Sequence, residues 1–293
     1  MRLETWYSSA LAITKSYFVY EPPAFVQRQE PHLLYLFRGH EREWVNMHED
    51  HSRQTSTAIE DIDRLIQSGF LPPLVAIMPG LNSTDNSVPS LGIDMVGKLR
   101  RKKGLGTGRY WSYLTEELIP MMDQRYRQRG KSLRLMAGFS LGGFTVSLLA
   151  TKLAGYFRHA AIYDGLFMWP QHRDPRIGKQ SANDKIWCNS FLFDSAFGKP
   201  RNLEAMHEWN PTDMLRRADE SKLQLIRRTK FWVASAPQDG MFGNRDRARY
   251  YVSLLKRKKV RRGFRRIIHH PHAQHNWHWT DRFLIKFLLE IFS

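Results

Sequence analysis

The sequence predicts an α/β fold: a mostly parallel central sheet with helices on both faces, in a single domain spanning residues 1–293. Three observations support it. Strand-like and helix-like segments alternate along most of the chain, as they do in parallel sheets with crossover helices. A serine stands in a glycine-rich turn between a predicted strand and a predicted helix. Candidate aspartate and histidine partners follow it, each just after a predicted strand.

The first third of the chain predicts strands divided by turn residues, with one amphipathic helix. The strands are expected at residues 10–13, 16–20, 32–37 and 74–78, where short apolar runs end at Gly or Pro. Ile59, Ile62 and Ile66 recur at helical spacing and predict a helix over residues 57–68, which Gly69 ends. Residues 80–108 predict a long loop, because Gly, Asn, Ser and basic residues dominate them.

The rest of the chain continues the alternation, with one interruption. A helix is expected over residues 110–126, with a kink or break at Pro120. Strands are expected at 133–137, 158–163, 230–235 and 264–268, and helices from 141, over 244–257 and over 279–292. Residues about 165–228 form an aromatic-rich insertion after the strand that follows the serine's helix. Insertions at this place in an α/β sheet commonly form a substrate wall. We therefore expect Trp169, Trp187 and Trp209 to contact substrate, with plain packing as the alternative.

The composition is that of an ordinary globular chain, except for its charge. Lys and Arg total 45 against 28 acidic residues, a formal charge of +17, with basic clusters at residues 98–103 and 256–262. Such a surface favours anionic partners. No nucleic-acid-binding motif accompanies the clusters, so we expect no specific nucleic-acid partner.

Three features of the sequence concern the cellular location of the protein. No apolar run approaches the length of a membrane span. The N-terminus lacks a signal-like apolar segment, and the single cysteine, Cys188, excludes an intramolecular disulfide bond. We therefore expect a cytoplasmic protein.

Gly138-Phe139-Ser140-Leu141-Gly142-Gly143 is the most informative stretch. It matches the G-x-S-x-G pattern, and a serine on a sharp strand-to-helix turn is the nucleophile elbow of α/β-hydrolases. The helix that starts at Leu141 would direct free N–H groups toward the serine oxygen. Ser140 is therefore the candidate nucleophile.

A serine nucleophile needs a base, and the base needs an orienting acid. In this fold the chain order is Ser, then Asp or Glu, then His. Asp239, just past the strand at 230–235, is the preferred acid, and Asp164 and Asp246 are its rivals. His275 is the preferred base in the histidine-rich loop before the last helix, and His272 is its main rival.

Two further features concern the oxyanion and metal binding. We expect the backbone N–H groups of Leu141 and His40 to form the oxyanion hole, since His40 follows a glycine turn after an early strand. The loop histidines include no helical pair with a glutamate, so we expect no metal site and no cofactor.

Four segments together resemble the putative esterase family of α/β-hydrolases, which includes esterase D, enterochelin esterase, feruloyl esterase domains and mycobacterial mycolyltransferases. They are residues 34–39 with Trp44, residues 115–120, residues 138–143 and residues 275–279. The resemblance covers roughly residues 30–290. It implies Ser140 as nucleophile, His275 as base and Asp239 as acid. The chain departs from the family at Arg38, where the family often has His before the glycine, and in the lead-in to Asp239.

The sequence thus predicts a serine esterase that hydrolyses a carboxylic ester through an acyl-enzyme intermediate. The substrate is expected to be a small-molecule ester, and the positive charge favours an anionic one. Two alternatives remain open: an acyltransferase with the same triad, and a non-catalytic binding protein with this fold and a basic surface. The sequence does not predict the oligomeric state.

Overall fold

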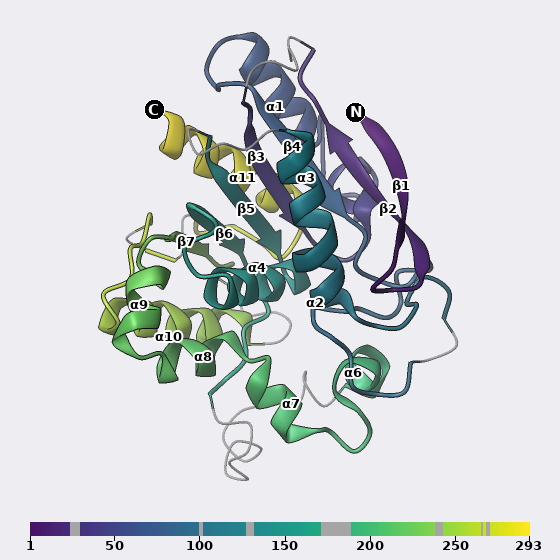
Figure 1. Cartoon of the computed structure of the whole chain (residues 1–293). Coiled ribbons are helices and arrows are strands. Elements are labelled where there is room, and N and C mark those ends of the chain that lie inside the picture. The colour runs from purple at the N-terminus through teal and green to yellow at the C-terminus, as the bar shows by residue number, and fades with distance from the viewer. Residues whose placement is uncertain are drawn as a thin grey trace.

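The structure is a computed structural model that describes residues 1–23, 30–99, 102–126, 132–170, 189–237, 243–264, 266–267 and 270–293. Its centre is a seven-stranded sheet of order β1-β2-β4-β3-β5-β6-β7 (Figure 1). The strands are β1 (Arg2–Ser8), β2 (Ile13–Tyr20), β3 (His32–Phe37), β4 (Leu74–Pro79), β5 (Arg134–Phe139), β6 (His159–Tyr163) and β7 (Lys230–Ala234). Strands β3 to β7 pair in parallel, and only β1 and β2 run antiparallel to their neighbours. The predicted fold class is therefore confirmed.

The N-terminal edge of the sheet differs from the prediction. The strand expected at residues 10–13 is wrong: residues 9–12 form the turn between β1 and β2, and Ala12 has a φ of 53°. The apolar character of this turn comes from Leu11, which is fully buried. Strand β1 was not predicted, because an edge strand leaves apolar side chains such as Leu3 and Tyr7 exposed and so lacks a clean alternation.

Most helices begin and end near the predicted positions. They are α1 (Ala58–Gln67), α2 (Tyr110–Ser112), η2 (Tyr113–Leu118), α3 (Ile119–Arg125), α4 (Leu141–Lys152), α10 (Asn244–Arg257) and α11 (Trp277–Phe292). The short helix η1 (Glu41–Trp44) was not predicted. The predicted irregularity at Pro120 takes the form of a π-helical turn, η2, which ends two residues before the proline. The N–H of Ile119 donates to the carbonyl of Leu114, five residues back. Pro120 has no N–H to continue the ordinary helical ladder, which favours such a local adjustment.

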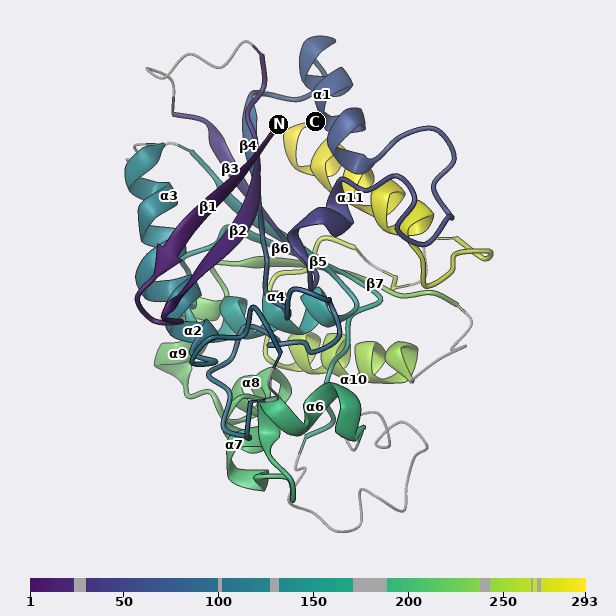
Figure 2. The ribbon, with the colours of Figure 1, turned by 90° about the vertical axis from the view of Figure 1, so that its right-hand side faces the viewer.

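Helices cover both faces of the sheet, and each face has its own hydrophobic layer (Figures 1 and 2). On one face, α1 and α11 bring Ile62 and Leu284 against the strands. On the other, α4 and α10 contribute Val146 and Tyr251. Because the central strands are covered on both sides, their side chains are buried almost without interruption.

The chain between β6 and β7 carries a group of short helices: α6 (Ser190–Phe197), α7 (Leu203–Glu208), α8 (Pro211–Arg217) and α9 (Glu220–Ile226). Helices α6 and α7 lie beyond the end of the sheet at which β5 leads into α4 (Figures 1 and 2). Helix α8 packs against α4 and α10. None of the helices in the described ranges is both long and apolar enough to cross a bilayer.

The strand expected at 264–268 includes residues 265 and 268, which lie outside the described residues. The neighbouring chain runs beside β7: the N–H of Phe231 donates to the carbonyl of Arg261 at 2.9 Å, and the N–H of Ser235 to the carbonyl of Ile267 at 2.8 Å. The described residues of this segment thus follow the edge strand through individual hydrogen bonds.

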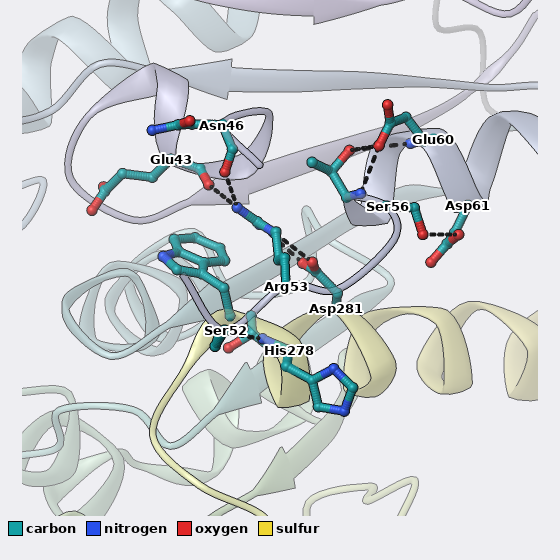
Figure 3. Close-up of polar contacts among 12 residues, drawn as sticks. Glu43, Asn46, Ser52, Arg53, Ser56, Glu60, Asp61, His278 and Asp281 are labelled. Carbon is teal, nitrogen blue, oxygen red and sulfur yellow. Dashed lines mark hydrogen bonds and ion pairs between the residues drawn. The ribbon is translucent and has the colours of Figure 1, made fainter. Parts of the chain in front are cut away.

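A buried arginine joins the loop after η1 to the start of α11 (Figure 3). The Nε of Arg53 lies 2.6 Å from Oδ2 of Asp281, and its Nη2 donates to Oδ1 at 3.1 Å. Its Nη1 donates to the carbonyls of Glu43 and Asn46 at 3.0 and 2.6 Å. The guanidinium also stacks 4.4 Å from the centre of the Trp277 ring. Arg53 therefore fixes the beginning of α11, two residues after His275, against the turn that follows β3.

We expect His159 to make the fold sensitive to mild acid. Burial, together with nearby Lys230, Arg158 and Arg261, lowers the pKa of His159 to about 4, whereas an unfolded histidine titrates near 6.5. Between these values the unfolded chain binds the extra proton, so stability falls as pH decreases from about 6.5 to 4. The Trp232 Nε1–H donates to His159 Nδ1 at 3.0 Å, which also requires the neutral ring.

His159→Gln keeps an acceptor for Trp232 but removes this titration. Urea unfolding at pH 7 and pH 5 should show a loss of stability that is smaller in His159→Gln than in the parent by about 1 kcal/mol, after discounting for partial exposure. His48→Gln, outside the buried core, is the control. Equal losses in the parent and His159→Gln would contradict the assignment.

Arg53→Met should destabilise the protein by about 3–5 kcal/mol, because it leaves the buried Asp281 carboxylate without its partner. The double variant Arg53→Met, Asp281→Leu should recover much of the loss, since neither charge then remains buried. Arg64→Met, on the exposed side of α1, is the matched control and should change stability by less than about 0.5 kcal/mol. Denaturant unfolding measures all three, and equal stability of the Arg53→Met and Arg64→Met variants would refute the role.

Candidate active site

Ser140 lies in the turn between β5 and α4 with a strained backbone, at φ 54° and ψ −114°. A residue other than glycine in this region costs on the order of 1–3 kcal/mol, so the surroundings must hold it there. Its N–H donates to the carbonyl of Tyr163 at 3.2 Å, and its carbonyl accepts from Leu166 at 2.9 Å and Gly143 at 3.0 Å. These bonds tie the turn to the end of β6.

Two of the neighbouring glycines are required by close backbone approach. A Cβ on Gly142 would lie 1.9 Å from the carbonyl oxygen of Phe37, at the end of β3. A Cβ on Gly138 would lie 2.3 Å from the carbonyl oxygen of Gly142. The G-x-S-x-G pattern therefore has a steric cause here, because β3, β5 and the first turn of α4 meet without room for side chains.

His275 forms a hydrogen bond with Asp164, the alternative acid of the sequence analysis. The Nδ1 of His275 lies 2.6 Å from Oδ2 of Asp164. Asp164 directly follows β6, and His275 lies in the loop before α11, so residues 111 positions apart meet at the carboxyl edge of the sheet. An ionised Asp164 requires the proton on Nδ1, which leaves Nε2 of His275 with a free lone pair.

The surroundings of Asp164 keep it ionised. Burial by itself would raise the pKa of Asp164, but hydrogen bonds from His275, from the Ser235 hydroxyl and from the Ala236 N–H outweigh it and hold the pKa below its ordinary value. The Ser235 Oγ donates to Oδ1 at 2.6 Å and the Ala236 N–H at 3.2 Å. The chain just after β7 thus supports the carboxylate that follows β6.

The preferred acid of the sequence analysis, Asp239, lies outside the described residues. The third candidate, Asp246, is on α10, where its carboxylate is half exposed and lies 3.8 Å from both Arg245 and Arg249. Of the two candidates that the structure describes, only Asp164 contacts His275.

The aromatic ring of Phe139, the residue before Ser140, packs against three side chains at this edge of the site. The ring of His275 lies 4.6 Å from it, and that of Trp277 packs edge-on at 5.2 Å. The guanidinium carbon of Arg38 lies 5.1 Å from the centre of the same ring. A candidate base and a cation therefore share one aromatic neighbour.

The remaining histidines of the loop are placed differently. His270 stacks on Trp279 at 4.4 Å and lies 5.6 Å from His272, the rival base. His278, in the first turn of α11, donates its N–H to Ser52 (Figure 3), and His269 is outside the described residues. Within the ranges the structure describes, no three His, Cys, Asp or Glu side chains are grouped to hold a metal ion.

The two predicted oxyanion donors differ in their surroundings. Leu141 is the first residue of α4, so its N–H has no helical carbonyl four residues back to bond. The N–H of His40, in contrast, donates to Oε2 of Glu43 at 2.7 Å, and the same oxygen accepts from Gly39 at 2.8 Å. This is a capping box at the start of η1. In this conformation the His40 N–H is already paired.

The predicted substrate-wall tryptophans have separate environments. Trp209 is almost fully buried, and its ring centre lies 5.7 Å from that of Trp111. The Lys152 ammonium lies 3.7 Å from the centre of the Trp209 ring. Trp169 is half buried beside Tyr250, with its indole N–H unpaired among the described residues. Trp187 lies outside the described residues. The packing around Trp209 agrees with the alternative, structural interpretation of that residue.

The contacts of Arg53 and Arg38 were not predicted from the sequence. Arg53 and Asp281 are 228 positions apart, so no local pattern connects them. Arg38 differs from the residue that the family often has before the glycine. Its position next to the glycine turn after β3 is the sequence feature that could have pointed to a role at the site.

Comparison with known proteins gives one family across nearly the whole chain. The family model described as Putative esterase matches residues 8–288. No curated protein matches the chain in sequence.

Solved structures of esterases and other serine hydrolases have a similar fold. A ferulic acid esterase matches with a TM-score of 0.70 and 18% identity, over 100% of this chain and 98% of its own. An S-formylglutathione hydrolase from Agrobacterium tumefaciens matches with a TM-score of 0.65 and 14% identity, over 99% and 95%. Fluorophosphonate-binding serine hydrolase F from Staphylococcus aureus matches with a TM-score of 0.64 and 15% identity, over 100% and 98%. With the family model spanning residues 8–288, the chain belongs to the putative esterase family of α/β-hydrolases.

Proposed function

We propose that this protein is a serine esterase that hydrolyses a carboxylic ester of a small molecule through an acyl-enzyme intermediate. The observation that carries the proposal is the 2.6 Å hydrogen bond between His275 and a buried, ionised Asp164, beside the strained turn that presents Ser140. Family membership supports the same chemistry.

The proposed reaction begins with attack by the Ser140 hydroxyl on the ester carbonyl. His275 takes the serine proton at Nε2, and Asp164 holds the ring in the tautomer that allows this and stabilises the imidazolium that forms. His275 then returns the proton to the leaving alcohol. In the second half, His275 activates water to release the acid and regenerate Ser140.

The oxyanion of each tetrahedral intermediate would be stabilised from the start of α4. The N–H of Leu141 and the positive end of the helix face the proposed nucleophile's turn. We keep His40 as the second proposed donor. Its N–H can take this role only when the Glu43 carboxylate releases it, because one N–H does not serve both acceptors well.

Ser140→Ala should abolish labelling by a fluorophosphonate probe and lower the hydrolysis of 4-nitrophenyl butyrate by at least about 10³-fold, because the triad acts as a unit. Ser253→Ala, on α10, is the control and should label like the parent. An unlabelled parent protein, or a Ser140→Ala variant that hydrolyses the ester at the parental rate, would refute the proposal.

The identity of the acid can be tested separately. Asp164→Asn should lower kcat by about 10³- to 10⁴-fold, since an amide favours the wrong histidine tautomer. Asp239→Asn should keep kcat within about threefold of the parent if Asp239 does not take part in catalysis. Steady-state kinetics with 4-nitrophenyl butyrate compare the two. A large loss in Asp239→Asn with a small one in Asp164→Asn would restore Asp239 as the acid.

A further inference from the structure

Arg38 places a cation at the edge of the candidate active site. It directly follows β3, whose last residue, Phe37, is opposite Gly138 of β5. Its guanidinium carbon lies 5.1 Å from the centre of the Phe139 ring, and the His275 ring lies 4.6 Å from that same ring. The positive charge and the proposed base therefore both lie against the ring of the residue that precedes the proposed nucleophile.

The donors of this guanidinium are not used by the part of the chain that the structure describes. The side chain of Arg38 forms no hydrogen bond there, and its Nε is buried without a partner. Its nearest carboxylate oxygen is Oε1 of Glu43, at 3.9 Å from Nε, which is an ion pair without a hydrogen bond. The other oxygen of Glu43 already accepts from the N–H groups of Gly39 and His40.

Arg38 is nevertheless held in place and can be reached from solvent. Its side chain is 19% exposed, and stacking on Phe139 restricts its movement. A guanidinium carries five N–H donors in a planar fork that matches the two oxygens of a carboxylate. Its buried Nε lacks a partner among the described residues, and the partly exposed side chain leaves N–H donors within reach of a ligand.

We propose that Arg38 binds a carboxylate group of the substrate, so that the enzyme selects ester substrates that carry a single negative charge. This inference rests on the proposed esterase function and names the substrate class for it. The nearby Glu43 partly neutralises the guanidinium, which favours a monoanionic carboxylate over a doubly charged phosphate. The formal charge of +17 draws any anion toward the protein but does not select one.

The inference is tested with pairs of esters that differ only in a carboxylate and its neutral, isosteric carboxamide. One pair carries the group on the alcohol side: 4-carboxyphenyl and 4-carbamoylphenyl butyrate. The other carries it on the acyl side: the 4-nitrophenyl half-ester of adipic acid and its monoamide. The measurement is the ratio of kcat/KM for acid and amide within each pair, for the parent, Arg38→Gln and Arg42→Gln.

In at least one pair the parent should prefer the acid by about 10- to 100-fold, as expected for charge-assisted hydrogen bonds. Arg38→Gln should remove most of this preference, chiefly through KM, because binding remote from the reacting carbonyl is made equally before and during reaction. Arg42→Gln removes the same charge from an exposed position four residues further along the chain and should keep the preference. Arg38→Lys should keep only part of it, since an ammonium lacks the planar fork.

Three outcomes overturn the inference. A parent with no preference for the acid in either pair shows that the site does not select carboxylates. Equal losses of preference in Arg38→Gln and Arg42→Gln assign it to the general field. A fall that is equal for acid and amide in Arg38→Gln assigns Arg38 a structural role. Each of these leaves the proposed esterase intact as long as the parent labels with fluorophosphonate at Ser140, whereas loss of labelling and of all turnover refutes the esterase itself.

Discussion

The hydrogen bond between Asp164 and His275 joins the parts of the molecule on which the candidate site depends. Asp164 follows β6, whose neighbour in the sheet is β5, the strand that leads to Ser140. His275 belongs to the loop before α11, a helix packed on the opposite face of the sheet from α4. The Asp164 carboxylate is buried, and a buried carboxylate is stable only when its acceptor capacity is filled. Its donors come from two segments: the loop of His275, and the chain just after β7, which supplies Ser235 and Ala236.

The position of Ser140 requires comparable support. Its backbone is strained, and the strain is held by hydrogen bonds to the end of β6 and by backbone contact between α4 and β3. The loop of His275 is fixed in turn by Trp277, which packs between Phe139 and Trp44, and by the buried contact of Arg53 with Asp281. The rigid core on both faces of the sheet therefore limits how far these side chains can move apart.

Charge acts at two ranges in this protein. The large excess of Lys and Arg produces a long-range field that salt screens over about 10 Å. In the proposed role, Arg38 acts at contact distance, where its unused donors add direction to its positive charge. The same short segment also contains Glu43, whose carboxylate closes the turn after β3 and occupies the N–H of His40. In the proposed mechanism, the second oxyanion donor and the binding of an anion thus both depend on residues of the turn after β3: His40 with Glu43, and Arg38.

The succession of strands and helices along the central part of the chain, and the position of Ser140 within it, could be predicted from the sequence alone. These features are local: a strand, a tight turn and a helix impose their residue types on adjacent positions, and Gly138 and Gly142 are needed for contacts that follow directly from that turn. Which of the described aspartates meets His275 became evident only in the folded molecule, because more than one aspartate follows a strand and the parallel strands end at one edge of the sheet. The tertiary structure also decided the partner of Arg53, 228 positions away, the edge strand β1, and the pairing of the His40 N–H. Each of these features depends on which parts of the chain come into contact once the sheet has formed. The spacing of residues along the chain does not indicate those contacts.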